Sequence, residues 1–235
     1  MENLNQTVKV TEFIFLSFTK STRLSVLLFI IFLLGYLLII CMNIVMILVI
    51  KFDTRVHTPM YFFIFNLCCL DICCTTSVIP QTLSNLMRSK PSILFLNCAT
   101  QTFSSAGFST AEIFVVTVMA YDRYMAICNP LRYETVMSWA RCSMLVIVAW
   151  MLAFMIALTI VCCVYTLPFC RRPEIEHFFC DIGQVLFLTC TNVPSHMAAE
   201  FISYFLGLGL ITIPFLIYLY ILSVYNLSYN EDPYH

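Results

Sequence analysis

Two carboxyl residues, Asp71 and Glu112, each lie inside a long stretch that holds no other charged residue. A charged carboxylate at the centre of a membrane costs about 3 kcal/mol or more, so such residues face the interior of a helix bundle and find a partner. Two neighbouring carboxylates cannot both ionise unless a cation lies between them. We therefore expect either a sodium ion at Asp71 and Glu112, with Asn43 nearby, or carboxyls that are protonated and hydrogen-bonded. Neither a base nor a nucleophile accompanies them, so catalysis is not expected.

A second group, Asp122, Arg123 and Tyr124, lies at the end of the stretch that contains Glu112. An Asp beside an Arg at a helix end predicts a local ion pair that can be held or released, which suits a conformational switch. The alternative is a solvated charge pair at a membrane boundary, and the pair alone is compatible with both.

The cysteines fall into two classes. Most of the 13 lie inside apolar stretches, where Cys behaves as a small hydrophobic residue. Cys98, Cys170, Cys180 and Cys190 are instead associated with predicted loops, and they can pair only in an oxidising compartment. Four cysteines allow three pairings, and the residues alone do not select one.

The elements that carry these residues are predicted to be membrane helices. The chain is 61% hydrophobic and only 11% charged, with a mean hydropathy of +0.91, which excludes a typical soluble domain. Crossing a membrane takes about 20 apolar residues per helix. The stretches of sufficient length predict an all-α membrane protein with spans at about 25–50, 57–86, 96–126, 141–166 and 197–225. An outer loop is expected at about 167–196, with an N-terminal segment at 1–24 and a divergent tail at 226–235.

The orientation follows from the loops. An odd number of spans places the N-terminus on the same face as the loop cysteines. That face also carries the N-glycosylation sequon Asn5-Gln6-Thr7, so we expect the N-terminus outside the cell. The distribution of Lys and Arg slightly favours the opposite orientation, but the cysteine chemistry is the stronger argument. No basic stripe with interleaved aromatic residues is present, so nucleic-acid binding is not expected.

Several motifs together resemble the olfactory receptors, the largest branch of the rhodopsin-like G-protein-coupled receptors. The most specific is the string from Met119 to Tyr133, MAYDRYMAICNPLRY. The segment His57–Phe63, HTPMYFF, is similar to the start of the family's second helix, and Asn43 and Trp150 match its first and fourth helices. The segment His177–Asp181, HFFCD, matches its outer loop. The resemblance covers roughly residues 10–216 and implies a rhodopsin-like helical bundle.

The resemblance also implies specific roles. It pairs Cys98 with Cys180 and Cys170 with Cys190, which would hold the outer loop over a ligand cavity. It implies a small organic odorant as ligand, a heterotrimeric G protein of the stimulatory olfactory type as partner, and the plasma membrane as location. Arg123 would be released from Asp122 to meet the G protein. The positions carried over to the ligand site are Ser105, Ala106, Ser109 and Thr110, although small residues also serve plain helix packing.

One feature departs from the family pattern. The sequence contains five of the family's seven spans, so we expect a truncated receptor with impaired signalling. Two alternatives stay open. The first is a non-signalling remnant that is retained in the endoplasmic reticulum. The second is a small transporter or channel built around Asp71 and Glu112, although the five glycines show no paired repeat of the transporter kind.

Overall fold

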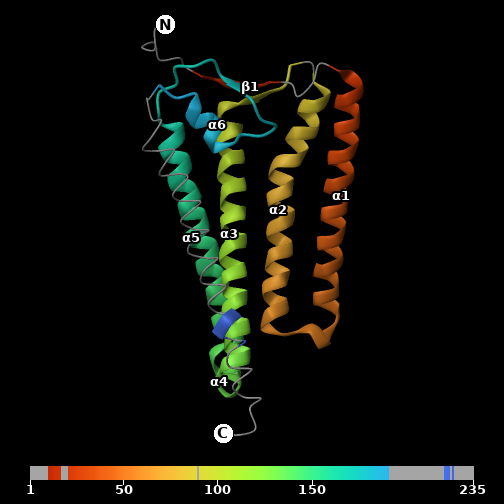
Figure 1. The fold of residues 1–235 in the computed structure, drawn as a ribbon, viewed down its shortest axis with the longest axis vertical. Coiled ribbons are helices and arrows are strands. Elements are labelled where there is room, and N and C mark those ends of the chain that lie inside the picture. Colours follow the sequence, from red (N-terminus) through yellow and green to blue (C-terminus); the bar gives the residue numbers. More distant parts are fainter. Residues whose placement is uncertain (1–9, 17–20, 89, 191–219, 223, 225–235) are drawn as a thin grey trace.

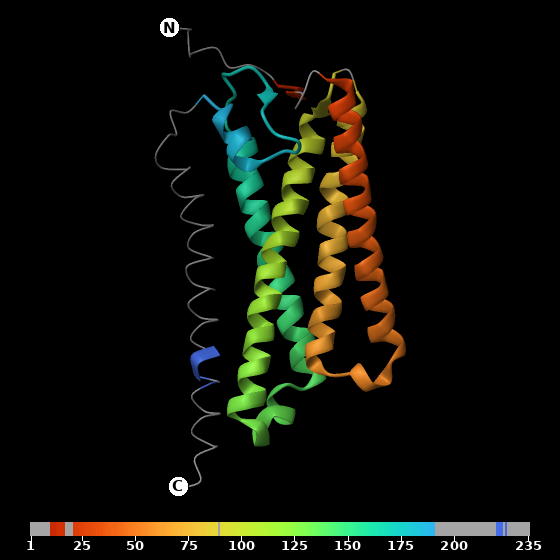
Figure 2. The same cartoon turned by 45° about the vertical axis from the view of Figure 1, so that its right-hand side comes forward.

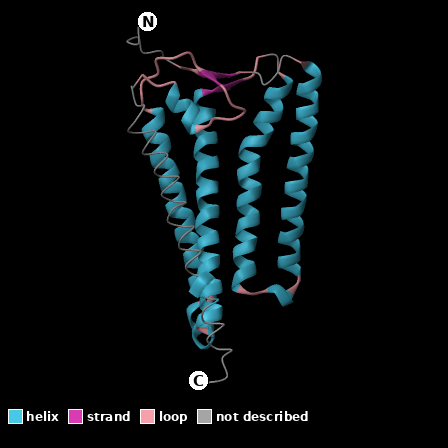
Figure 3. Cartoon of the chain, viewed as in Figure 1, coloured by secondary structure: helices cyan, strands magenta, loops and turns pink. Residues whose placement is uncertain are grey.

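Four long helices make up most of the part of the chain that the computed structural model describes, which is residues 10–16, 21–88, 90–190, 220–222 and 224. They run side by side as a bundle (Figures 1 and 3). By length and composition each could cross a membrane, so four of the five predicted spans are confirmed. The predicted span at 197–225 lies almost entirely outside the described residues. The helices are α1 (Thr22–Phe52), α2 (Pro59–Met87), α3 (Phe95–Cys128) and α5 (Trp139–Tyr165).

The surface of α1 shows why lipid is the solvent of this bundle. The helix has 31 residues, which at about 1.5 Å per residue is about 46 Å, longer than the roughly 30 Å hydrocarbon core. Large apolar side chains along it are open to the surroundings, with Leu34 61% and Leu38 64% exposed. In lipid these apolar side chains contact an apolar solvent, and the helix satisfies its own backbone hydrogen bonds. Exposed leucines are therefore compatible with a lipid-facing helix.

The contact between α3 and α5 depends on small residues. Ala149, Ala153 and Ala157 follow one another at intervals of one helical turn on α5, and each is at most 5% exposed. Gly107 of α3 is also buried, and a Cβ atom added there would lie only 2.6 Å from the ring of Phe154. Small residues let membrane helices approach closely, so these positions set the spacing of the two helices.

Two short helices connect the spans at one end of the bundle. The 3₁₀ helix η1 (Thr54–Val56) joins α1 to α2, and α4 (Pro130–Val136) joins α3 to α5. Pro59 and Pro130 occupy the first turns of α2 and α4, where a proline is tolerated because its missing N–H has no partner there. In Figures 1 and 2, α4 lies just beyond the end of α3.

A small sheet covers the opposite end of the bundle. Its strand order is β2-β1-β3, with β1 (Glu12–Phe15) in the centre, β2 (Ser92–Leu94) antiparallel to it and β3 (Glu174–Ile175) parallel to it. The segment 182–187 forms the helix α6 (Ile182–Phe187), and the Asp181 side chain accepts a hydrogen bond from the Gln184 backbone nitrogen at its start. We call the three strands together with residues 167–190 the cap.

The cap has its own apolar core. Phe13 is completely buried, and its ring centroid lies 5.8 Å from those of both Phe95 and Phe169. Phe15 and Ile175 are also buried and belong to the same apolar cluster, so the strand β1 packs against the outer loop. The sequence predicted no strand in the N-terminal segment 1–24 and only a loop at 167–196. The structure adds β1, β3 and α6, while residues 1–9, 17–20 and 191–196 lie outside the described part.

Candidate functional site

Two disulfides hold the cap in place. Cys98, in the first turn of α3, is bonded to Cys180, 82 residues further along the chain, with their Cα atoms 5.5 Å apart. Cys170 is bonded to Cys190, with a Cα separation of 4.6 Å. These are the two pairings that the resemblance implies. The first bond attaches the outer loop to the end of α3, and the second closes the loop on itself around α6.

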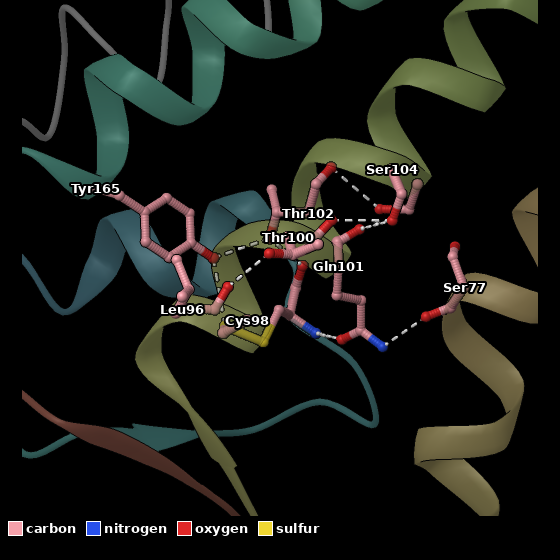
Figure 4. The surroundings of a disulfide bond; sticks show 10 residues. Ser77, Leu96, Cys98, Thr100, Gln101, Thr102, Ser104 and Tyr165 are labelled. Carbon is pink, nitrogen blue, oxygen red and sulfur yellow. Dashed lines mark hydrogen bonds between the residues drawn. A yellow bond between two sulfur atoms is a disulfide. The ribbon is translucent and has the colours of Figure 1, made fainter.

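Gln101 adds a polar link from the same helix (Figure 4). Its Oε1 atom accepts a hydrogen bond from the Cys180 backbone nitrogen at 3.0 Å, and its Nε2 atom donates to the Ser77 carbonyl of α2 at 3.1 Å. The side chain is only 6% exposed, so both bonds are made away from solvent. One residue therefore connects α2, α3 and the cap.

Thr102 completes the attachment on the side of α5. Its hydroxyl donates to the Cys180 carbonyl at 3.0 Å and lies 2.8 Å from the hydroxyl of Tyr165. The Tyr165 hydroxyl in turn lies 3.3 Å from the Cys98 sulfur. Figure 4 shows Tyr165 beside Thr102 and the disulfide. On α2, the Thr82 hydroxyl reaches the Phe178 carbonyl at 3.2 Å. The backbone around Cys180 is thus bonded directly to α2 and α3, while Tyr165 of α5 contacts the Thr102 hydroxyl and the disulfide.

Sequence reasoning missed Gln101 and Thr102, although a signal was present. They follow Cys98 by three and four residues, and residues at these spacings share a face of a helix. Once Cys98 is assigned to the outer loop, two polar residues on the same face are natural partners for that loop's backbone.

The four predicted ligand residues lie deeper along α3. Ser105, Ala106 and Ser109 are half-buried, whereas Thr110 is only 5% exposed. The Ser105 hydroxyl donates to the Thr102 carbonyl of its own helix at 3.3 Å. The Ser109 hydroxyl lies 3.5 Å from the Cys74 sulfur of α2. Ser109 therefore faces α2, where its partner is a thiol, which is only a weak donor and acceptor.

The polar residues of the membrane interior come together between α1, α2 and α3. Asp71 and Glu112 lie close enough for their charges to interact, although they belong to neighbouring helices. The Asn43 amide interacts with Asp71, and its nitrogen also donates to the Ile39 carbonyl of α1 at 3.0 Å. The described residues include no group of three or more His, Cys, Asp or Glu side chains arranged for a metal. A cation here would depend on two carboxylates with amide and hydroxyl oxygens.

At the other end of α3 the predicted ion pair is replaced by a different contact. Asp122 is 1% exposed and accepts a hydrogen bond from the Tyr133 hydroxyl of α4 at 2.9 Å. Arg123 is exposed and its guanidinium contacts the Met60 sulfur of α2. Within the described residues no salt bridge joins Asp122 to Arg123. Adjacent helical residues point about 100° apart, so the two side chains do not form a salt bridge in this structure, and their role as a switch stays a prediction. Tyr124 is half-buried against the bundle core.

The protonation of Tyr133 suits its role as donor. Burial and the bond to the Asp122 carboxylate both raise the pKa of Tyr133 above its ordinary value, burial having the larger effect. The phenol therefore keeps its proton over the physiological pH range and continues to donate to Asp122. The remaining predicted site residue, Asn5, lies outside the described residues.

Comparison with known proteins agrees with this geometry. Residues 42–230 match the model of the 7 transmembrane receptor (rhodopsin family). The chain is 40% identical over 208 residues to human olfactory receptor 10Q1, covering 88% of this chain and 64% of that protein. It is 41% identical over 219 residues to human olfactory receptor 10K1 (93% and 69%) and 44% identical over 192 residues to human olfactory receptor 5G3 (82% and 61%).

The chain thus spans between 61% and 69% of the length of these three relatives. The matched region contains the end of α1, the whole of α2, α3 and α5, both disulfides and the Asp122–Tyr124 segment. The chain belongs to the olfactory receptors, a group within the rhodopsin family of seven-transmembrane receptors.

Proposed function

We propose that this protein is an odorant receptor, which binds a small organic ligand beneath the cap and activates a stimulatory heterotrimeric G protein at the Asp122 end of α3. The observation that carries the proposal is the fixed position of the cap. The bonds of Gln101 and Thr102 to Cys180 hold the outer loop at the end of α3, one turn from Ser105. A cap held in a fixed position beside the half-buried hydroxyls of Ser105 and Ser109 suits the recognition of a small molecule.

The ligand contacts in this proposal come from the small residues of α3. The Ser105 hydroxyl makes a hydrogen bond of 3.3 Å, which is long for an O–H···O bond, and the Ser109 hydroxyl has only a thiol sulfur, a weak partner, at 3.5 Å. An odorant with a carbonyl or hydroxyl group can offer a shorter bond, while Ala106 leaves space for its apolar part. Thr110 supports the site from its buried position.

The G-protein contact comes from the opposite end. Tyr133 donates to Asp122, and the neighbouring Arg123 forms no salt bridge with any residue that the structure describes and lies exposed beside Met60. An exposed guanidinium can donate hydrogen bonds to backbone carbonyls or to a carboxylate of a partner protein. Tyr124 packs against the bundle core and anchors the helix end that presents Arg123.

A sodium ion between Asp71 and Glu112 is part of the proposal. The two carboxylates interact across α2 and α3, and a cation between them would remove the cost of two buried charges. The test is thermal unfolding in detergent with sodium or with the bulkier organic cation N-methylglucamine at the same ionic strength. Sodium should stabilise the protein and should lose its effect in Glu112→Gln, whereas Glu134→Gln on α4 should behave like the unmodified chain. Equal stability in both salts would contradict the site.

We further propose that the cap faces the exterior of the cell and that the protein resides in the plasma membrane. The two disulfides support this orientation because they need an oxidising compartment. In this orientation η1 and α4 face the cytoplasm, where a G protein is found.

The decisive experiment measures cAMP in cells that express the chain together with a stimulatory olfactory G protein, while an antibody detects its N-terminus on intact cells. At least one member of an odorant panel should raise cAMP. Ser109→Ala should weaken that response, whereas Thr159→Ala should not, because Thr159 bonds only the Met155 carbonyl on the exposed face of α5. The proposal would be contradicted if the protein reached the cell surface but no odorant raised cAMP. An ion current in the absence of the G protein would instead support a channel.

A further inference from the structure

A groove of about 530 Å³ lies at the end of the bundle opposite the cap, where α1, η1, α2 and α5 meet. This size falls in the range of about 300–1,000 Å³ that is usual for small-molecule sites. Neither the odorant site nor the G-protein contact proposed above uses it. Its main lining residues are Ile47, Ile50 and Lys51 of α1, Phe62 and Phe65 of α2, and Trp139 of α5.

The wall of the groove is apolar and turned toward lipid. Phe62 and Trp139 meet edge to face, with ring centroids 6.0 Å apart, and form one side. Trp139 is nevertheless 53% exposed, as expected of a tryptophan at the boundary between hydrocarbon and headgroups. On α1 the neighbouring side chains Ile44 and Leu48 are exposed apolar residues of the lipid-facing surface. An occupant therefore enters from the membrane.

The rim of the groove is basic. Lys51 lines it, and Arg55 immediately precedes the lining residue Val56. Both side chains are exposed, and within the described residues neither forms a salt bridge. The acid between them, Asp53, accepts a hydrogen bond from the Arg55 backbone nitrogen at 2.9 Å. The His57 ring lies 3.0 Å from the Ile50 carbonyl at the end of α1. The Lys51 ammonium lies 5.9 Å from the centre of the Phe52 ring, and both cations are exposed, so a headgroup can reach them.

We propose that this groove binds an anionic phospholipid of the cytoplasmic leaflet, with one acyl chain against Ile47, Phe62 and Phe65 and the headgroup at Lys51 and Arg55. The charge of the rim decides the class of lipid. A neutral sterol would use the apolar wall but gain nothing from two cations, whereas an acidic headgroup is attracted by each of them. The cytoplasmic leaflet, which follows from the orientation proposed above, is the one that carries anionic lipids.

The test uses the chain in lipid nanodiscs that contain a trace of photoactivatable phosphatidylserine with a diazirine in its acyl chain. Photoactivatable phosphatidylcholine with the same acyl chain is the matched probe. Mass spectrometry then locates the label. The segment 47–65 should be labelled more strongly by the serine lipid, and unlabelled phosphatidylserine should compete. Because each cation near an anionic surface contributes about fivefold in affinity, the double variant Lys51→Gln/Arg55→Gln should weaken binding about thirtyfold.

Two controls separate this site from general lipid contact. Arg132→Gln removes an exposed charge of α4 at the same end and should leave the labelling unchanged. Ile47→Phe fills the groove and should lower the labelling, whereas Ile147→Phe, at a 61% exposed position of α5, should not. The proposal is overturned if both phospholipids label segment 47–65 equally. It is also overturned if cholesterol displaces the label while phosphatidylserine does not, or if the charge variant binds like the unmodified chain.

Discussion

Replacing Gln101 by Met should loosen the cap without breaking either disulfide. Methionine has a similar length but can neither accept from the Cys180 backbone nitrogen nor donate to the Ser77 carbonyl. The Cys180 nitrogen would be left buried without its acceptor, which costs about 1–3 kcal/mol. The Ser77 carbonyl lies inside α2 and loses only a supplementary bond, worth about 1 kcal/mol. The sum is about 2–4 kcal/mol.

Hydrogen exchange of the cap backbone measures this change. A loss of 2–4 kcal/mol corresponds to about thirty- to a thousandfold faster exchange of the Cys180 amide if the cap opens as a unit. The matched control is Gln184→Met on α6, since only the backbone nitrogen of Gln184 bonds to Asp181. Amides in the middle of α3 should exchange at unchanged rates in both variants. If the Cys180 amide of Gln101→Met exchanged no faster than that of Gln184→Met, the link between α2, α3 and the cap would be refuted.

Three further substitutions test other parts of the molecule. Gly107→Ala should destabilise the bundle by about 1–3 kcal/mol, because the new Cβ would lie 2.6 Å from the Phe154 ring. Thermal unfolding in detergent measures this loss, and Gly35→Ala is the control, because a Cβ there meets no atom of the described residues within 4 Å. Phe13→Ala should cost the cap core about 3–5 kcal/mol, seen as faster proteolysis of segment 170–190, and unchanged cleavage would contradict its role. Tyr133→Phe should cost about 1.5–3 kcal/mol by removing the donor to Asp122. The pKa of Tyr133 is raised in the folded state, so its stabilising effect is complete below the unfolded pKa of about 10. This stabilisation is lost as the pH rises through the higher folded pKa, and the Tyr133→Phe variant should therefore lack this loss of stability at alkaline pH.

The membrane helices could be predicted closely from the sequence because the length of an apolar stretch is a local property. The predicted spans 25–50, 57–86, 96–126 and 141–166 correspond to four described helices, each within a few residues of its observed bounds. The prediction ended slightly early at α1, where the charged Lys51 continues the helix beyond the apolar stretch.

The cap could not be predicted in the same way. Strand β1 has only four residues, and its partners Ser92–Leu94 and Glu174–Ile175 are about 80 and 160 residues away. The alternation of buried Phe13 and Phe15 with exposed Glu12 and Ile14 is typical of a strand, but a pattern this short has weight only once a partner is known. The disulfide pairing also required the family resemblance, because four cysteines alone leave three choices.

The switch region shows where adjacency in sequence misleads. Asp122 and Arg123 are neighbours in the chain, yet the carboxylate bonds to Tyr133, 11 residues further on, because α4 turns back against α3. By contrast, Asp71 interacts with both Asn43 and Glu112, with which it was expected to lie, while the sodium ion stays a prediction. The ligand roles of Ser105, Ala106, Ser109 and Thr110, and the glycan at Asn5, stay predictions.

The central claim is that the disulfide-bonded cap stands outside the cell, over the end of α3. Intact cells are treated with a reductant that cannot cross membranes, then with a thiol reagent that also stays outside, and the labelled peptides are identified. The account predicts that Cys98, Cys180, Cys170 and Cys190 become labelled without permeabilisation, and only after reduction. Labelling of these four cysteines that required permeabilised cells, or that needed no reductant, would contradict it.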